Sequence, residues 1–245
     1  MNDVLDWLTA GAHWSGEDGV PHRILEHLYY SGIAVLIAAV IAIPLGLFVG
    51  HTGRGRFVVV NAVGAARAIP SLGLLFVAVL LLGPRLSGDT AFVVPCELVL
   101  VVLAIPPILA GAYAGVEEVD PAVRDAAKGM GMRGMEVLTS VEIPCALPLI
   151  FSGVRSGALQ VVATATIAAT AGLGGLGRFL IDGLAVRDYA QMAAGAVLVG
   201  LLALVVDLGF ALVQRYAVSP GLTGRFRARI GVARNEAPDP RTVIT

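Results

Sequence analysis

Several polar side chains lie inside the long apolar runs of this sequence, where a polar group needs either a partner or a function. A carboxylate or a basic group at that depth could pass protons, and such a relay would use Glu97, Arg67 or Asp207. Hydroxyl and amide groups could instead line a weakly polar path for a small solute. For each residue the plainer alternative is a structural partner elsewhere in the protein. The set is Asn61, Arg67, Glu97, Arg155, Gln160, Thr164, Thr166, Thr170 and Asp207.

We assign a smaller group of these and neighbouring residues to a substrate path. Thr166 and Thr170 share a helix face because they are four residues apart, although each hydroxyl could alternatively bond to its own helix. Pro70 and Ser71 interrupt an apolar run, and a proline there leaves a carbonyl group free. The predicted path residues are Asn61, Pro70, Ser71, Glu97, Thr166 and Thr170.

The sequence lacks the motifs for ATP hydrolysis and for metalloprotease chemistry. It contains no G-x-x-x-x-G-K-[ST] and no H-E-x-x-H, so we expect neither ATP hydrolysis nor a metalloprotease site in this chain. We also expect no metal site and no cofactor. Cys96 and Cys145 fall near opposite membrane faces, and we interpret both as small apolar fillers.

A glycine-rich run resembles a dinucleotide motif but lacks the required context. Gly172, Gly174 and Gly177 spell G-x-G-x-x-G, which binds nucleotides when it follows a strand in a βαβ unit. Here it follows a long apolar run. We predict an outer bend with a structural or gating role, formed by Gly172, Gly174, Gly175 and Gly177.

The elements that carry these residues belong to a membrane protein. Hydrophobic residues make up 57% of the 245 residues and charged residues 14%, with a mean hydropathy of +0.83. Soluble domains carry roughly 25% charged residues. The net charge of -1 gives no attraction to nucleic acid, and we expect no nucleic-acid partner. The lipid bilayer is therefore the expected surroundings.

Five apolar runs are long enough to cross a bilayer, which takes about 20 residues each. Backbone groups in lipid must bond within their own segment, so these runs predict helices. The predicted fold is an all-α, polytopic helix bundle, with residues 1–23 outside the membrane, 24–218 as the transmembrane domain and 219–245 as a cytoplasmic tail. The runs are Ser31–Gly50, which could start as early as Ile24, Phe57–Leu82, Ala91–Ala114, Ala146–Ala171 and Ala190–Val213.

The orientation follows from the positive charges in the connecting segments. Eleven Lys and Arg residues lie on one side of the predicted bundle and four on the other. The richer side is cytoplasmic, so the N-terminus is predicted outside and the C-terminus inside a cell membrane. Several prolines and closely spaced glycines within the runs predict bent helices that pack closely.

A polar segment, residues 117–142, separates the third and fourth runs on the cytoplasmic side. Asp120 and Pro121 are typical of a helix start, and Gly129 and Gly131 are typical of its end. A second short helix is expected from Arg133 to Val141, ended by Pro144. Helices this short need a surface to dock against, and the methionines between them suit a protein interface. A merely solvated loop is the alternative.

The run "DAAKGMG", nine further residues and "VEIP" resemble the cytoplasmic loop of ABC importer permeases. The family pattern is Glu-Ala-Ala, three residues, Gly, nine residues and Ile-x-Leu-Pro, and this sequence departs from it only by Asp125, Val141 and Ile143. The resemblance implies a coupling helix seated on an ATPase subunit. Its implied residues are Asp125, Ala126, Ala127, Gly129, Met130, Gly131, Met132 and Pro144.

Further stretches, including "ARAIPSLGLLFVAVLLLG" and "ATAGLGGLGRFLIDGL", resemble the permeases for osmoprotectants such as glycine betaine, choline or carnitine. Methionine-type permeases share the loop and remain an alternative, as does a proton-coupled secondary transporter or membrane enzyme. The resemblance implies alternating access, an ATPase dimer that holds ATP and Mg²⁺, a second permease chain and an extracytoplasmic binding protein. The runs contain few aromatic side chains, which bind quaternary ammonium groups best, so we expect the binding protein to capture the substrate.

Overall fold

The computed structural model describes residues 2–66 and 68–218, and the regular structure in this part of the chain is helical. Four stretches there are long and apolar enough to cross a membrane. These are α2 (Val20–Thr52), α5 (Thr90–Glu117), α10 (Tyr189–Ala217) and a continuous stretch formed by α7 (Gly134–Val137), a π-helical turn η3 (Leu138–Glu142), α8 (Ile143–Ala168) and a 3₁₀ turn η4 (Ala169–Ala171). The predicted all-α membrane bundle is confirmed.

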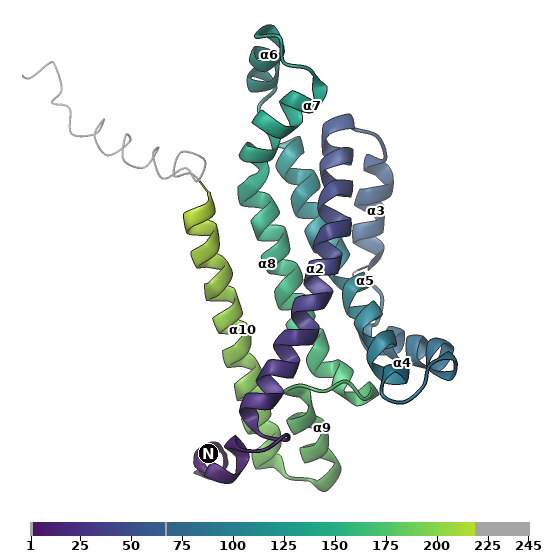
Figure 1. Cartoon of the computed structure of the whole chain (residues 1–245), viewed down its shortest axis with the longest axis vertical. Helices are drawn as coiled ribbons and strands as arrows, with labels where there is room; N and C mark the ends of the chain where they lie inside the picture. The colour runs from purple at the N-terminus through teal and green to yellow at the C-terminus, as the bar shows by residue number, and fades with distance from the viewer. Residues whose placement is uncertain (1, 67, 219–245) are drawn as a thin grey trace, which may run out of the picture.

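Shorter helices connect and flank these four stretches. They are α1 (Asn2–Thr9), η1 (Gly11–Trp14), α3 (Arg56–Ala66), α4 (Ser71–Leu82), η2 (Gly83–Arg85), α6 (Pro121–Gly129) and α9 (Gly177–Val186). Helices α6 and α7 lie at one end of the molecule, whereas α1 and α9 lie at the other (Figure 1). Residues 219–245, which we predicted to form a cytoplasmic tail, lie outside the described residues.

The second predicted span, Phe57–Leu82, is divided into two helices. α3 has 11 residues and α4 has 12, so each is about 16–18 Å long at 1.5 Å per residue. Neither crosses the roughly 30 Å hydrocarbon core alone. Pro70 is the N-cap residue of α4, in an extended conformation that a helix interior does not allow. The count of five uninterrupted spans is therefore not confirmed.

Helix α5 is the centre of the bundle, because α2 and α8 pack against it on two sides (Figure 1). Small residues let these backbones approach closely. A Cβ atom added at Gly46 would lie 2.6 Å from the Cβ of Ala112, and one added at Gly111 would lie 2.7 Å from the Cα of Gly153. The close packing predicted from the glycine spacing is confirmed.

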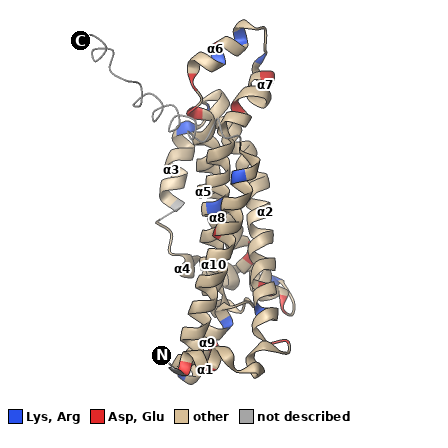
Figure 2. Ribbon diagram, turned by 90° about the vertical axis from the view of Figure 1, so that its left-hand side faces the viewer, with Lys and Arg blue, Asp and Glu red and all other residues tan. Residues whose placement is uncertain are grey.

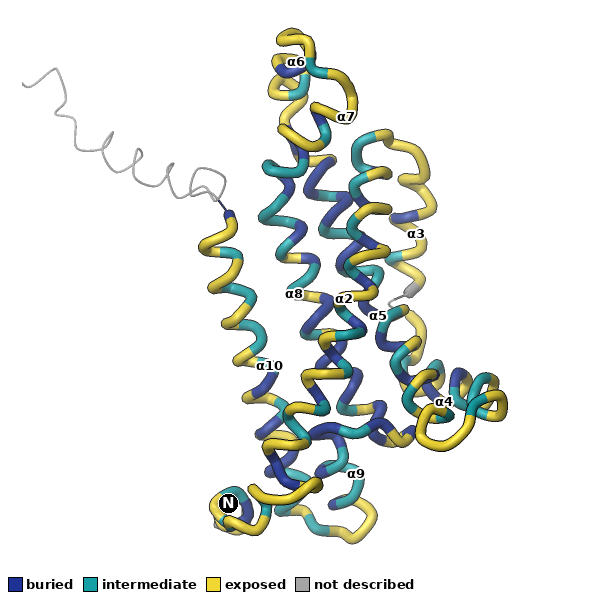
Figure 3. Tube along the Cα trace, in the orientation of Figure 1, coloured by how far each residue is buried: buried dark blue, intermediate teal, exposed yellow. Residues whose placement is uncertain are grey.

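The surface of the bundle matches a lipid environment. Large apolar side chains are exposed along its length, such as Phe57, Leu80 and Val205, each at least 65% exposed (Figure 3). Most charged residues gather at the two ends of the long axis (Figure 2). A chain of this pattern stays in the membrane, with its charged ends reaching the two aqueous sides.

Prolines lie inside the long helices without ending them. Pro44 is inside α2, Pro95, Pro106 and Pro107 are inside α5, and Pro148 is inside α8. A proline has no N–H, so the carbonyl group four residues earlier loses its helical partner. Pro106 and Pro107 therefore leave the carbonyl groups of Val102 and Leu103, near the middle of α5, without their usual helical partners.

Candidate functional site

The short helix α6 has well-formed caps at both ends. The side chain of Asp120 accepts a hydrogen bond from the backbone N–H of Ala122 at 2.8 Å, as expected for an N-cap residue. After Gly129 the chain turns at Gly131, whose φ of +92° is left-handed, and the N–H of Met132 bonds back to the carbonyl of Ala127 at 3.1 Å. The predicted start and end of this helix are confirmed.

The two faces of α6 differ in exposure. Ala127 is 2% exposed and faces the protein, whereas Asp125, Ala126 and Gly129 are exposed. The exposed face continues into a hollow of about 340 Å³ lined by Met130, Gly131, Met132, Glu136 and Ser140. Met130 is 74% exposed although it is apolar. The end of the molecule thus presents a surface on which methionine side chains lie beside polar and charged groups.

The segment that follows α6 differs from our prediction. Instead of a second short helix ended by Pro144, α7 continues through the π turn into α8, and Pro144 lies in the first turn of α8. The prediction that Pro144 ends a helix was wrong. The backbone N–H of Ile143 bonds to the carbonyl of Leu138, five residues earlier, and this wider turn accommodates a proline directly after it.

A buried carboxylate beside this turn was missed by sequence reasoning. Glu142 is 2% exposed, and it lies within ion-pair distance of Arg124 in α6 and His51 in the last turn of α2. The signal in the sequence was a glutamate at the edge of an apolar run. Nothing in the residue pattern indicated that His51, 91 residues away, would be its partner.

A cavity of about 420 Å³ lies between the start of α4, the proline pair of α5 and the middle of α8. Its lining mixes polar and apolar groups: Ile69, Ser71, Leu103, Pro106, Pro107, Ser156 and Gln160. Two of the residues singled out in the sequence, Ser71 and Gln160, lie here, and Pro70 is adjacent as the N-cap of α4. This is the polar cavity at mid-depth in the bundle.

The other predicted path residues do not line this cavity. The amide of Asn61 donates to the carbonyl of Phe57 at 2.7 Å, and the hydroxyls of Thr166 and Thr170 donate to Val162 and Ile167 carbonyls at 3.1 and 2.8 Å. Both carboxylate oxygens of Glu97 are buried and have no hydrogen-bond partner among the described residues. Arg67 lies outside the described residues.

Arg155 and Asp207 form the structural pair that we gave as the plainer alternative. Nε and Nη2 of Arg155 in α8 donate to the two carboxylate oxygens of Asp207 in α10 at 2.5 and 2.6 Å. This two-pronged contact gives both charges a partner within the apolar length of the bundle. Asp207 is therefore paired with a residue of the neighbouring helix α8.

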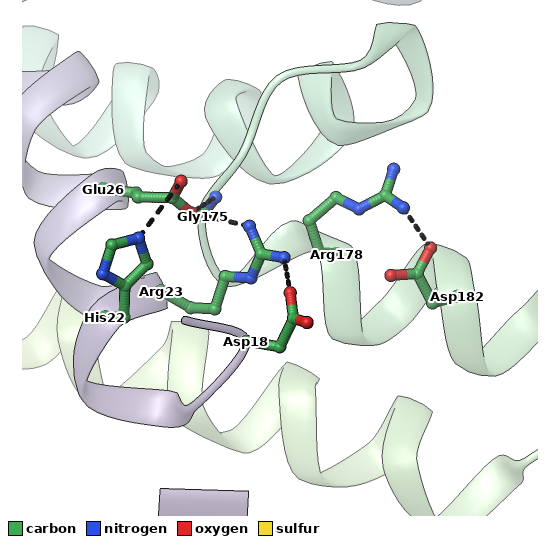
Figure 4. Close-up of polar contacts among 7 residues, drawn as sticks. All are labelled: Asp18, His22, Arg23, Glu26, Gly175, Arg178 and Asp182. Atoms are coloured by element: carbon green, nitrogen blue, oxygen red, sulfur yellow. Dashed lines mark hydrogen bonds and ion pairs between the residues drawn. The ribbon is translucent and has the colours of Figure 1, made fainter. Parts of the chain in front are cut away.

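The four glycines of the predicted outer bend lie between the end of α8 and the first residue of α9, and the start of α2 contacts this bend. Glu26 accepts a hydrogen bond from the N–H of Gly175 at 2.9 Å, and Arg23 joins Glu26 to Asp18 at 2.8 and 2.5 Å (Figure 4). Gly172 and Gly175 have φ of +98° and +89°. His27 also reaches the carbonyl of Val162 in α8 at 3.1 Å.

Side chains are excluded at the other two glycines of the bend. A Cβ atom at Gly174 would lie 2.8 Å from a carboxylate oxygen of Glu26, and one at Gly177 would lie 2.3 Å from the carbonyl oxygen of Thr166. Such distances do not occur for real Cβ atoms without a shift of the neighbours. Close packing and left-handed turns explain this glycine run without a nucleotide. Among the described residues, no group of three His, Cys, Asp or Glu could hold a metal ion.

Known proteins resemble this chain in sequence. Residues 42–218 match the family described as binding-protein-dependent transport system inner membrane component. The chain is 34% identical to the glycine betaine/carnitine/choline transport system permease protein OpuCB of Bacillus subtilis, over 91% of this chain and 98% of that one. It is 31% identical to the choline transport system permease protein OpuBB of the same organism, over 82% and 89%.

The fold is also found among solved structures. A chain of the MetNI methionine ABC transporter, solved in inward-facing conformations, aligns with a TM-score of 0.69 at 21% identity, covering 80% of this chain and 94% of that one. The helical fold, the membrane-spanning composition and the relatives that cover nearly the whole chain thus indicate the same family. The chain belongs to the binding-protein-dependent transport system inner membrane component family.

Proposed function

We propose that this chain is the permease subunit of an ATP-driven importer for a small osmoprotectant of the glycine betaine, choline or carnitine class. The observation that carries the proposal is the capped, exposed helix α6 at one end of a membrane bundle whose relatives are named for these substrates. Its exposed face, with Asp125, Ala126 and Met130, offers a docking surface to an ATPase subunit. ATP and Mg²⁺ belong to that partner.

The cavity beside Ser71 and Gln160 is the proposed substrate path. It lies where α4 begins and beside the two prolines inside α5, so its wall contains the start of one helix and a proline-weakened segment of another, both of which can change position. Its polar groups are few and its described lining includes no aromatic side chain, so binding there is weak and release is easy. A second permease chain, identical or related, completes the path, and an extracytoplasmic binding protein supplies the substrate.

The proposed orientation puts α6 in the cytoplasm and the Gly172–Gly177 bend outside the cell. The larger number of Lys and Arg residues in the connecting segments on the α6 side supports this orientation. ATP-driven closure of the partner moves α6, and the bundle alternates between outward and inward access. Glu26 and Gly175 hold the outer bend in the conformation described here.

Two experiments test this function. The chain is purified from its native membrane to identify a co-purifying ATPase, and the complex is then reconstituted in liposomes with its binding protein. We expect uptake of labelled choline or glycine betaine that requires ATP and persists when the proton gradient is collapsed. Uptake driven by a proton gradient without ATP would favour a secondary transporter. Uptake of methionine in place of these quaternary ammonium compounds would place the chain in a different importer group.

A further inference from the structure

One cluster of side chains joins four elements at the α6 end of the bundle. It contains Glu142 from the π turn before α8, Arg124 from α6 and His51 from the last turn of α2, with the carbonyl of Val116 in the last turns of α5. The cluster lies apart from the exposed face of α6 and from the cavity beside Gln160. Neither the proposed ATPase docking surface nor the proposed substrate path therefore includes this cluster.

Both oxygens of the Glu142 carboxylate are used. Nδ1 of His51 lies 2.5 Å from Oε2, and because an ionised carboxylate only accepts, the histidine is the donor. Nε of Arg124 lies 2.8 Å from Oε1, which makes an ion pair without hydrogen-bond geometry at Nε. Nη2 of Arg124 also donates to the carbonyl of Val116. The side chain of Arg124 thereby connects α6 with α5 and with the base of α8 at once.

This connection matters because the other contacts of α6 are few. Its backbone packs on the π turn and on α7, and the side chain that it buries is that of Ala127. A single methyl group holds a short helix in place but does not define its direction. A guanidinium group that forms an ion pair with Glu142 and donates a hydrogen bond to the Val116 carbonyl does restrain it, because the planar group fixes both contacts relative to each other. A movement of α6 must therefore displace Arg124 and, with it, Glu142.

The π turn places Glu142 where it can receive this movement. The Ile143 N–H bonds to the Leu138 carbonyl in this turn, and single π turns often mark functional positions in helices. A buried ion pair adds little stability compared with apolar residues of the same size, whereas removing one partner leaves an uncompensated charge. Stability alone is thus a poor reason for charged groups at this position.

We infer that Glu142, held by Arg124 and His51, is the positioning contact that carries displacement of α6 into α2, α5 and α8. The inference rests on the proposed function, since it assumes that an ATPase partner moves α6. The contact acts through other residues and touches no substrate. It predicts that the pair can be neutralised with the fold intact but with transport uncoupled from ATP hydrolysis.

The test compares Arg124→Gln, Glu142→Gln and the double variant in the reconstituted complex. Each single variant breaks the Arg124–Glu142 ion pair, although His51 still contacts Glu142 in Arg124→Gln. We expect a lower melting temperature and about tenfold less uptake per ATP hydrolysed, within the usual range of allosteric coupling. In the double variant no unpaired charge remains, so the melting temperature recovers. Uptake per ATP stays low, because the two glutamine side chains no longer form the charged contact that transmits movement.

Arg54→Gln is the matched control, because Arg54 is exposed beyond the last turn of α2 and its removal leaves Glu142 untouched. It should keep the wild-type ratio of uptake to ATP hydrolysed. Recovery of that ratio together with the melting temperature in the double variant would overturn the inference, since the cluster would then be structural only. If the single variants do not reach the membrane, the ratio of uptake to ATP hydrolysed in the double variant alone decides whether the inference holds. If the wild-type complex shows no ATP-driven uptake, the proposed function itself is rejected.

Discussion

Gly131 shows how one residue determines the shape of the docking surface. Its φ of +92° is left-handed, where a side chain costs about 1–2 kcal/mol, yet no atom would meet an added Cβ within 4 Å. The cost of a substitution there is therefore conformational strain in the turn after α6. Packing of the bundle is not involved, so the effect should be local.

We predict that Gly131→Ala keeps the protein in the membrane but lowers substrate-stimulated ATP hydrolysis in the reconstituted complex. The turn after α6 must relax, and Met130 and Met132 then leave the docking surface. Gly200→Ala is the control, because Gly200 lies in α10, outside the docking surface, with open space around it. Equal stimulation in both variants would contradict a role of this turn in coupling.

Gly177 represents the opposite situation, in which space rather than backbone conformation requires glycine. An added Cβ would lie 2.3 Å from the Thr166 carbonyl oxygen and 2.8 Å from the Cβ of Ala169. We predict that Gly177→Ala lowers the free energy of unfolding by about 1–3 kcal/mol, the usual cost of overpacking. Thermal unfolding in detergent measures this. Gly200→Ala, with nothing within 4 Å, should unfold at the wild-type temperature.

At the scale of whole helices, ion pairs at different depths should contribute differently. Arg155 and Asp207 join α8 to α10 within the apolar length of both helices, whereas Arg56 and Glu117 join α3 to α5 at 2.8 Å with 65% and 38% of their side chains exposed. Water screens the second pair. Lipid offers no substitute partner to the first pair.

Asp207→Asn should therefore lower the melting temperature of the protein in lipid nanodiscs, because Arg155 loses its charged partner. Replacement of both residues by leucine should restore the melting temperature, since no unpaired charge is left. The control Glu117→Gln should change it little. A larger effect of Glu117→Gln than of Asp207→Asn would show that the Arg155 pair faces water.

At the scale of the molecule, the two ends of the bundle should face opposite sides of the membrane. Met130 at the α6 end is 74% exposed and Val186 at the α9 end is 73% exposed, so the two positions are equally accessible to reagents. The described cysteines, Cys96 and Cys145, are free, and Cys96 is buried. Alanine at both positions gives a background without reactive thiols.

In that background we predict that Val186→Cys reacts with a membrane-impermeant maleimide on intact cells, and that Met130→Cys reacts only after lysis. The reason is the larger number of Lys and Arg residues in the segments on the α6 side of the membrane, which is typical of the cytoplasmic side. Labelling is measured by mass shift on a gel. Reaction of Met130→Cys from the medium would reverse the orientation and exclude an ATPase at α6.

Local features of this protein were determined by its sequence. Composition alone indicated a membrane bundle, because 14% charged residues cannot cover a soluble surface. The start of α6 at Asp120 and its end before Gly131 followed from the conformational preferences of these residues. Such features depend on neighbours in the chain, so the order of residues is sufficient information.

Long-range partners were decided by the tertiary structure. Asp207 lies 52 residues from Arg155, Glu142 lies 91 from His51, and Gly175 lies 149 from Glu26. The division of the second run into α3 and α4 and the continuation of α7 into α8 also differed from the expected pattern. The membrane helices are apolar on all sides, so their sequences do not indicate which face meets a neighbour. Close contacts between small residues select that face, and they exist only once the helices are packed.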